Sequence, residues 1–148
     1  SILCGKADLS LALNGALASL VSITAGPDVA LPLQAIIIGA VGGVLCTLAI
    51  PLLDKLKIDD VVGAISVHLV AGIWGTLVVG IPGLGTLAAD FVTQLIGVVA
   101  IGVFVVVVSA ITWLILKGVI GLRPTEEEEM SGLDVSELGM EAYPEFRN

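Results

Sequence analysis

Long uncharged apolar segments dominate the hydropathy pattern of the chain. They cover residues 9–25, 31–53, 61–81 and 87–116, and Asp90 is the one charged residue inside them. A helix needs about 20 apolar residues to cross the roughly 30 Å hydrocarbon core of a bilayer. The segments lack the alternation of strands, and a backbone in lipid must satisfy its own hydrogen bonds. The pattern therefore predicts an all-α membrane protein with four transmembrane helices.

The basic residues predict one orientation for these spans. All of them fall before the first span, between the second and third, or after the fourth: Lys6, Lys55, Lys57, Lys117, Arg123 and Arg147. Cytoplasmic loops collect Lys and Arg. We therefore expect a multi-pass protein of the cell membrane whose C-terminus is cytoplasmic.

Composition supports a membrane region followed by an acidic tail. Of the 148 residues, 57% are hydrophobic and 14% charged, and mean hydropathy is +1.10. Residues 1–123 carry six acidic and five basic residues, whereas residues 124–148 carry eight acidic residues and one basic residue. We expect a transmembrane region over residues 1–121 and an acidic cytoplasmic tail over 122–148. The small residues of the stretch 39–43 predict close packing of the second span against another helix.

Several classes of function are not supported by any motif. The sequence contains no nucleotide-binding loop, no nucleophile paired with a base and no metal-ligand spacing, so we expect no enzyme, cofactor, metal or nucleic-acid partner. Cys4 and Cys46 are interpreted as small apolar residues. The chain begins without Met or a signal-peptide pattern, and we expect it to be the interior of a longer protein.

His68 is the candidate functional residue. It stands alone in an uncharged span, where an ionisable side chain costs roughly 2 to 3 kcal/mol or more and normally faces a bundle interior, cavity or conduction path. Ala64, His68, Ala71 and Gly75 recur at spacings of four, three and four, which predicts one shared face of small residues packed against protein. A neutral imidazole both donates and accepts hydrogen bonds, as a passage for a small amine or water requires. A histidine that only bonds a neighbouring helix remains the alternative.

Acidic and hydroxyl residues mark two expected helix starts. Asp59 and Asp60 precede the third span, where carboxylates cap free N–H groups and contribute about 0.5 to 2 kcal/mol. We expect their role to be structural. In the tail, Thr125 and Glu128 have the spacing of a capping box and predict a short helix.

Several motifs together resemble the Amt/Rh family of ammonium transporters. The segments 58–68 and 71–77 are similar to the tenth transmembrane helix of that family, and 8–26 is similar to the eighth. The tail segments 121–123, 126–129, 132–134 and 139–143 resemble the family's cytoplasmic tail, so the resemblance covers nearly all of the chain.

This resemblance implies the C-terminal portion of an eleven-helix homotrimer, namely helices eight to eleven and the tail. His68 would be the second of the paired pore histidines, with Ala64 on the same face. Asp60 would be mainly structural. Ammonium would lose its proton outside the pore, ammonia would pass the histidines, and a proton transfer would restore the charge. Leu69, where the family usually has Gly, departs from this pattern.

The resemblance also implies partners for the chain. They are ammonium or ammonia, the remaining helices of the transporter, the lipid bilayer and a PII-type regulatory protein at the tail. The tail residues concerned are Gly132, Leu133, Asp134 and Tyr143.

Two other functions remain open at this point. The chain could be a non-transporting membrane helical module, or an ammonium sensor of the same family. Finding the missing upstream helices fused to this chain would favour transport over a non-transporting module.

Overall fold

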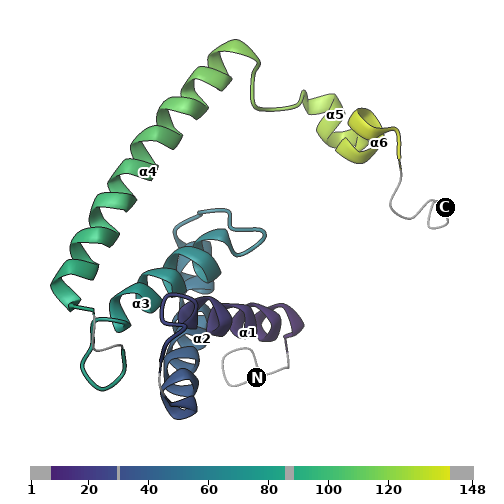
Figure 1. Cartoon of the computed structure of the whole chain (residues 1–148). Coiled ribbons are helices and arrows are strands. Elements are labelled where there is room, and N and C mark those ends of the chain that lie inside the picture. The colour runs from purple at the N-terminus through teal and green to yellow at the C-terminus, as the bar shows by residue number, and fades with distance from the viewer. Residues whose placement is uncertain (1–7, 30, 86–88, 141–148) are drawn as a thin grey trace. The chain divides into compact units, whose positions relative to one another are not determined.

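The described residues are helical and contain no strand, which confirms the all-α prediction for them. The computed structural model describes residues 8–29, 31–85 and 89–140, so Tyr143 lies outside the described residues. Its chain forms two compact units, residues 1–103 and 104–148. The helices, in chain order, are α1 (Leu9–Ile23), α2 (Pro32–Lys55), the π-helix η1 (Ala64–Val70), α3 (Ala71–Val78), α4 (Phe91–Val119), α5 (Glu126–Ser131) and α6 (Leu133–Leu138) (Figure 1).

Local hydrogen bonds set the ends of the first two helices. The Asp8 carboxylate accepts a hydrogen bond from the backbone N–H of Leu11 at 3.0 Å and so caps α1. Helix α2 begins at Pro32, whose missing N–H costs nothing in a first turn. The Gln34 side chain accepts from the N–H of Leu31 at 3.0 Å. These residues determine where each apolar segment becomes helical.

Helices α1, α2, η1 and α3 of the first unit pack around a small core. Ala18, Cys46, Val67 and Ala71 form one buried cluster. Glycine permits the close approach, because a Cβ at Gly42 would lie 2.8 Å from the Cβ of Ser22. The predicted close packing of the stretch 39–43 is thereby confirmed.

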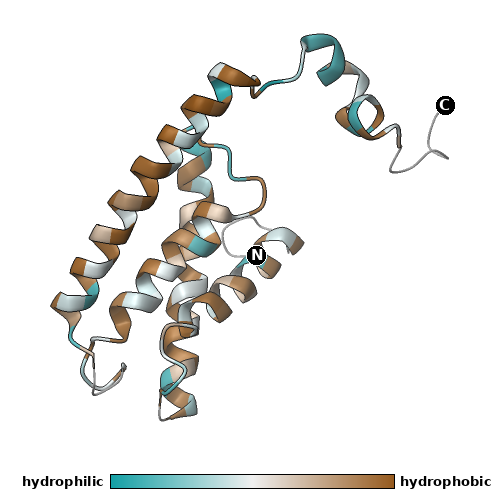
Figure 2. Ribbon diagram, turned by 45° about the horizontal axis from the view of Figure 1, so that its top comes forward, coloured by the Kyte–Doolittle hydropathy of each residue, from teal (hydrophilic) through white to brown (hydrophobic). Residues whose placement is uncertain are grey.

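Helix α4 is mostly apolar, with polar residues near its ends (Figure 2). None of its residues is buried within the described part of the chain. By length and composition, α2 and α4 could each cross a membrane, whereas α1 and the joined η1 and α3 are apolar but shorter. An apolar helix without protein cover is unfavourable in water and stable in lipid. The described helices therefore fit an all-α membrane protein.

Candidate functional site

His68 lies in a π-helix rather than in the α-helix expected from its spacing. The turn begins at Gly63, whose φ of 73° lies in the left-handed region that favours glycine. The Gly63 carbonyl accepts from the N–H of Val67 at 2.9 Å and from that of His68 at 3.3 Å. The second bond spans five residues, as in a π-helix. The π-helix therefore starts at Ala64, three residues after the start expected for the span, and the regular α-helix α3 starts only at Ala71.

The Asp60 carboxylate holds the first residues of η1. One oxygen accepts from the N–H of Ile65 at 3.0 Å, and the other accepts from the N–H and the hydroxyl of Ser66 at 2.9 and 2.8 Å. Burial raises the pKa of the Asp60 carboxyl, but these bonds stabilise its charged form more, so its pKa lies below the ordinary value. Asp60 is thus a charged acceptor for the turn before His68, while Asp59 is exposed.

The π-turn changes which residues share the buried face. Val67, Ala71, Gly75 and Val78 are buried, whereas His68 is exposed in this chain. Within the described residues, His68 therefore does not share a buried face with Ala71 and Gly75, and the packing of its own face against further helices stays a prediction. The physical reason is that a turn wider than 3.6 residues rotates the positions before Ala71 relative to those after it. Ala64 is exposed as well.

Two side-chain hydrogen bonds of η1 and α3 were not predicted from the sequence. The Ser66 hydroxyl, 1% exposed, donates to Asp60, and the Trp74 indole N–H donates to the carbonyl of Ile38 at 3.0 Å. The six residues from Asp60 to Ser66 exceed the spacing of an N-cap contact, so no local motif predicts this bond. The Trp74 bond joins residues 36 positions apart, and no local pattern predicts it.

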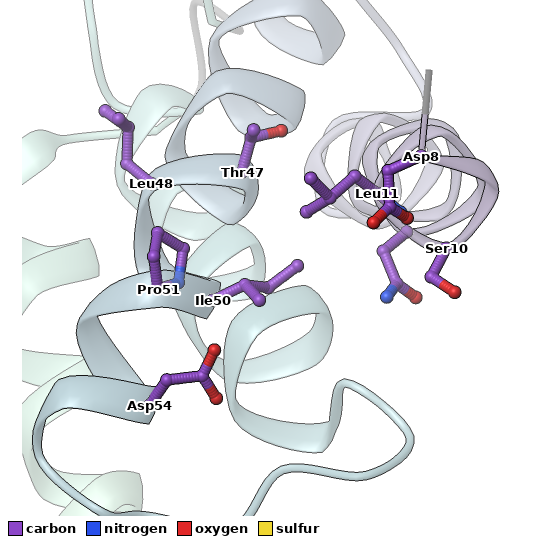
Figure 3. A pocket seen from close by; sticks show the side chains of 9 residues that line it. Asp8, Ser10, Leu11, Thr47, Leu48, Ile50, Pro51 and Asp54 are labelled. Carbon is purple, nitrogen blue, oxygen red and sulfur yellow. The ribbon is translucent and has the colours of Figure 1, made fainter. Parts of the chain in front are cut away.

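A groove of about 440 Å³ lies between the N-terminal part of α1 and the C-terminal part of α2 (Figure 3). Leu11 and Ile50 project into the space between the two helices. Asp8 and Asp54 place carboxylates on its wall. No residue of η1 lines it, so this groove is separate from the position of His68.

The described part of the tail forms two short helices, α5 and α6. The Thr125 hydroxyl accepts from the N–H of Glu128 at 3.3 Å, and the Glu128 carboxylate accepts from the N–H of Thr125 at 2.7 Å. This confirms the predicted capping box. Gly132, with a φ of 93°, separates the two helices, and Leu133 and Asp134 begin α6.

Acidification is expected to loosen the start of α5. Hydrogen bonds from the backbone N–H and the hydroxyl of Thr125 lower the pKa of the Glu128 carboxyl. A carboxyl with a lowered folded pKa contributes stability that is present above its unfolded pKa and is lost as the pH falls through the folded value. We expect the Thr125 amide signal in NMR spectra of the chain to move toward its unfolded position as the pH falls below the ordinary pKa range of a Glu carboxyl.

Substitution variants separate this transition from general acidification of the tail. In Glu128→Ala the Thr125 amide signal should lie near its unfolded position at every pH, whereas Glu126→Ala should keep the transition. A transition of equal size in Glu128→Ala would assign it to another acidic group.

The chain is similar in sequence to known proteins over nearly its whole length. Residues 1–143 match the model of the Ammonium Transporter Family. The chain is 40% identical over 144 residues to ammonium transporter Amt1 of Haloferax mediterranei, covering 96% of this chain and 28% of that protein. It is 36% identical over 159 residues to Amt2 of Archaeoglobus fulgidus, covering 96% and 34%, and 35% identical over 154 residues to Amt2 of Methanocaldococcus jannaschii, covering 98% and 36%. The chain thus spans about a third of the length of these relatives.

Proposed function

We propose that this chain, which belongs to the ammonium transporter family, supplies the C-terminal part of a membrane protein that carries ammonium or ammonia. The observation that carries this proposal is the exposure of His68 on an otherwise uncharged apolar helix. An ionisable side chain within a membrane faces protein, a cavity or a conduction path. In the complete protein, the face of η1 that bears His68 borders such a path.

In the proposed architecture, the four apolar segments are helices eight to eleven of eleven, and the complete protein is a homotrimer. The transmembrane region covers residues 1–121, and the acidic tail over 122–148 lies in the cytoplasm. The distribution of the basic residues supports this orientation in a cell membrane. A bilayer can thin locally around a helix that is shorter than its hydrocarbon core. The shorter helix α1 and the joined η1 and α3 can therefore cross it.

In the proposed passage, the His68 imidazole lines a narrow apolar pore together with Ala64. Its neutral form can accept a hydrogen bond at one ring nitrogen and donate one at the other. Ammonia meets this surface after ammonium has lost its proton, and the proton returns to it on the other side. Asp59 and Asp60 stay outside the pore, where Asp60 accepts the hydrogen bonds of the first turn of η1.

The tail is proposed as a docking surface for a PII-type regulatory protein. Leu133 and Asp134, at the start of α6, follow the turn at Gly132, and Tyr143 completes the set. Exposed apolar residues, Met130 and Leu138 among them, accompany the acidic ones on α5 and α6. An apolar centre that includes Met, surrounded by a polar rim, is the usual composition of a protein interface.

Reconstitution tests whether the chain needs the rest of the transporter. Purified residues 1–148 in liposomes should conduct no ammonium, because His68 is exposed here and a sealed pore needs protein on its far side. The complete transporter that contains the chain should conduct. The measurement is the change in internal pH after an ammonium pulse, with protein-free liposomes as the control. Conduction by residues 1–148 alone would contradict the proposed architecture.

A further inference from the structure

The turn that carries His68 is tied to the rest of the fold by a short series of contacts. Gly63 takes a left-handed conformation and its carbonyl accepts from the N–H of His68 at 3.3 Å. Three residues later, Ser66 is buried and both its N–H and its hydroxyl bond to one oxygen of Asp60. The position of His68 therefore depends on bonds made at Gly63 and at Ser66.

The Ser66 hydroxyl favours the wider π-turn over an ordinary capped α-helical turn. In an α-helix capped by a carboxylate, the cap accepts from the N–H groups two or three residues later. Here Asp60 accepts from residues five and six positions later, so the chain makes a wider loop before the helix begins. The hydroxyl adds a third bond to this carboxylate, at 2.8 Å, from a side chain with almost no contact with solvent. Without it, the Asp60 carboxylate would hold the wider turn only through the backbone N–H groups of Ile65 and Ser66.

The neighbouring residues hold Ser66 in this place. Val67, next to it, belongs to the buried cluster with Ala18 and Cys46, and it is 1% exposed. Ser66 and Val67 are both buried, whereas the following residue, His68, is exposed. A return to α-helical spacing would turn Val67 and His68 together relative to Ala71.

We propose that Ser66 is a positioning residue, whose hydroxyl holds the π-turn through Asp60 and thereby directs the His68 imidazole into the transport path. This inference rests on the proposed pore role of His68. Ser66 itself does not touch the transported species. Ser66 sets the direction of the His68 imidazole and limits the range of orientations that the ring can adopt. π-turns of this kind are frequent at functional sites.

The first test measures the turn directly in the 148-residue chain, reconstituted in lipid nanodiscs. The chain has a single histidine, so its labelled imidazole gives one assignable NMR signal. We expect Ser66→Ala to move this signal and to speed hydrogen exchange of the Ile65 amide about tenfold, as loss of one buried hydrogen bond does.

Ser19→Ala is the matched control, because its hydroxyl donates to the carbonyl of Gly15 in its own helix at 2.9 Å. It should leave both measurements at the wild-type values. If Ser66→Ala does not fold, Ser66→Cys keeps the side-chain size with a weaker donor and should produce smaller shifts in the same direction. Unchanged signals in the Ser66 variants, or equal changes in Ser19→Ala, would overturn the positioning role.

The second test uses the complete transporter and separates positioning from the pore role. Ser66→Ala should lower ammonium uptake about tenfold, and Ser19→Ala should not lower it. If Ser66→Ala moves the His68 signal but His68→Ala itself transports normally, the turn is held as described and the pore role is overturned. A third outcome would overturn the inference itself. In it, His68→Ala lowers uptake and Ser66→Ala moves the His68 signal, yet Ser66→Ala transports normally. The direction of the ring would then be irrelevant to transport.

Discussion

His68→Ala in the complete transporter is expected to lower ammonium uptake about tenfold or more, the loss that corresponds to about 1.4 kcal/mol in the barrier. If His68 lines the proposed apolar passage, the alanine removes a group that both donates and accepts hydrogen bonds there. Ammonia in that passage would then lose a partner while surrounded by hydrocarbon, which costs about 1 to 3 kcal/mol for an unsatisfied polar group. Uptake of labelled methylammonium into cells measures the effect.

The same variant should leave folding and assembly close to those of the wild type. His68 is exposed in this chain and belongs to none of its buried clusters, so its truncation opens no cavity in the described core. Size-exclusion profiles of the detergent-solubilised protein check this point. Val62→Ala, at another exposed position before η1, is the control and should transport normally. Wild-type uptake and selectivity in His68→Ala would count against a pore role.

Gly75→Ala is expected to destabilise the packing of α1 against α3 by about 3 kcal/mol. A Cβ at Gly75 would meet the backbone of Ser22, with the carbonyl carbon at 3.0 Å and the carbonyl oxygen closer still. A backbone carbonyl cannot rotate away as a flexible side chain can, so the two helices must separate. Loss of the close contact also weakens the bond from the Ser22 hydroxyl to the carbonyl of Ala71, 3.4 Å in length.

The neighbouring glycine provides the matched control in the same helix. A Cβ at Gly72 would lie 3.9 Å from a methyl group of Val21, which is an ordinary van der Waals contact. Gly72→Ala should therefore be neutral or slightly stabilising, because alanine has a higher helix propensity than glycine. Thermal unfolding of the purified protein in detergent compares the two variants. Equal stability of Gly75→Ala and Gly72→Ala would show that the helices can move apart at little cost.

Much of the fold could be predicted from local patterns. The uncharged segments predicted the helices. Both signals, the length of an apolar segment and the absence of alternating polar and apolar residues, can be read from a short stretch of chain. The capping box at Thr125 and Glu128 was predicted for the same reason, since both partners lie within one helical turn. The small residues of the stretch 39–43 indicated close packing, although they did not name Ser19 and Ser22 as the neighbours.

The candidate site was predicted less completely. His68 was singled out as an ionisable residue in an apolar span, but its face was assigned from the period of an α-helix. The wider turn depends on Asp60 reaching Ser66 and on Val67 entering the core beside Ala18 and Cys46. Ala18 and Cys46 lie on two other helices, so no window of sequence around His68 contains them.

The amino-acid sequence by itself determined that this protein is helical and suited to a membrane, because hydrophobicity over some 20 residues acts through the solvent and needs no partner. It also determined which side chain in the third segment is out of place in lipid. The tertiary structure alone decided where that side chain points. Packing of Val67 and the bonds from Ser66 to Asp60 outweigh the regular helical spacing, and both depend on groups brought together only by folding.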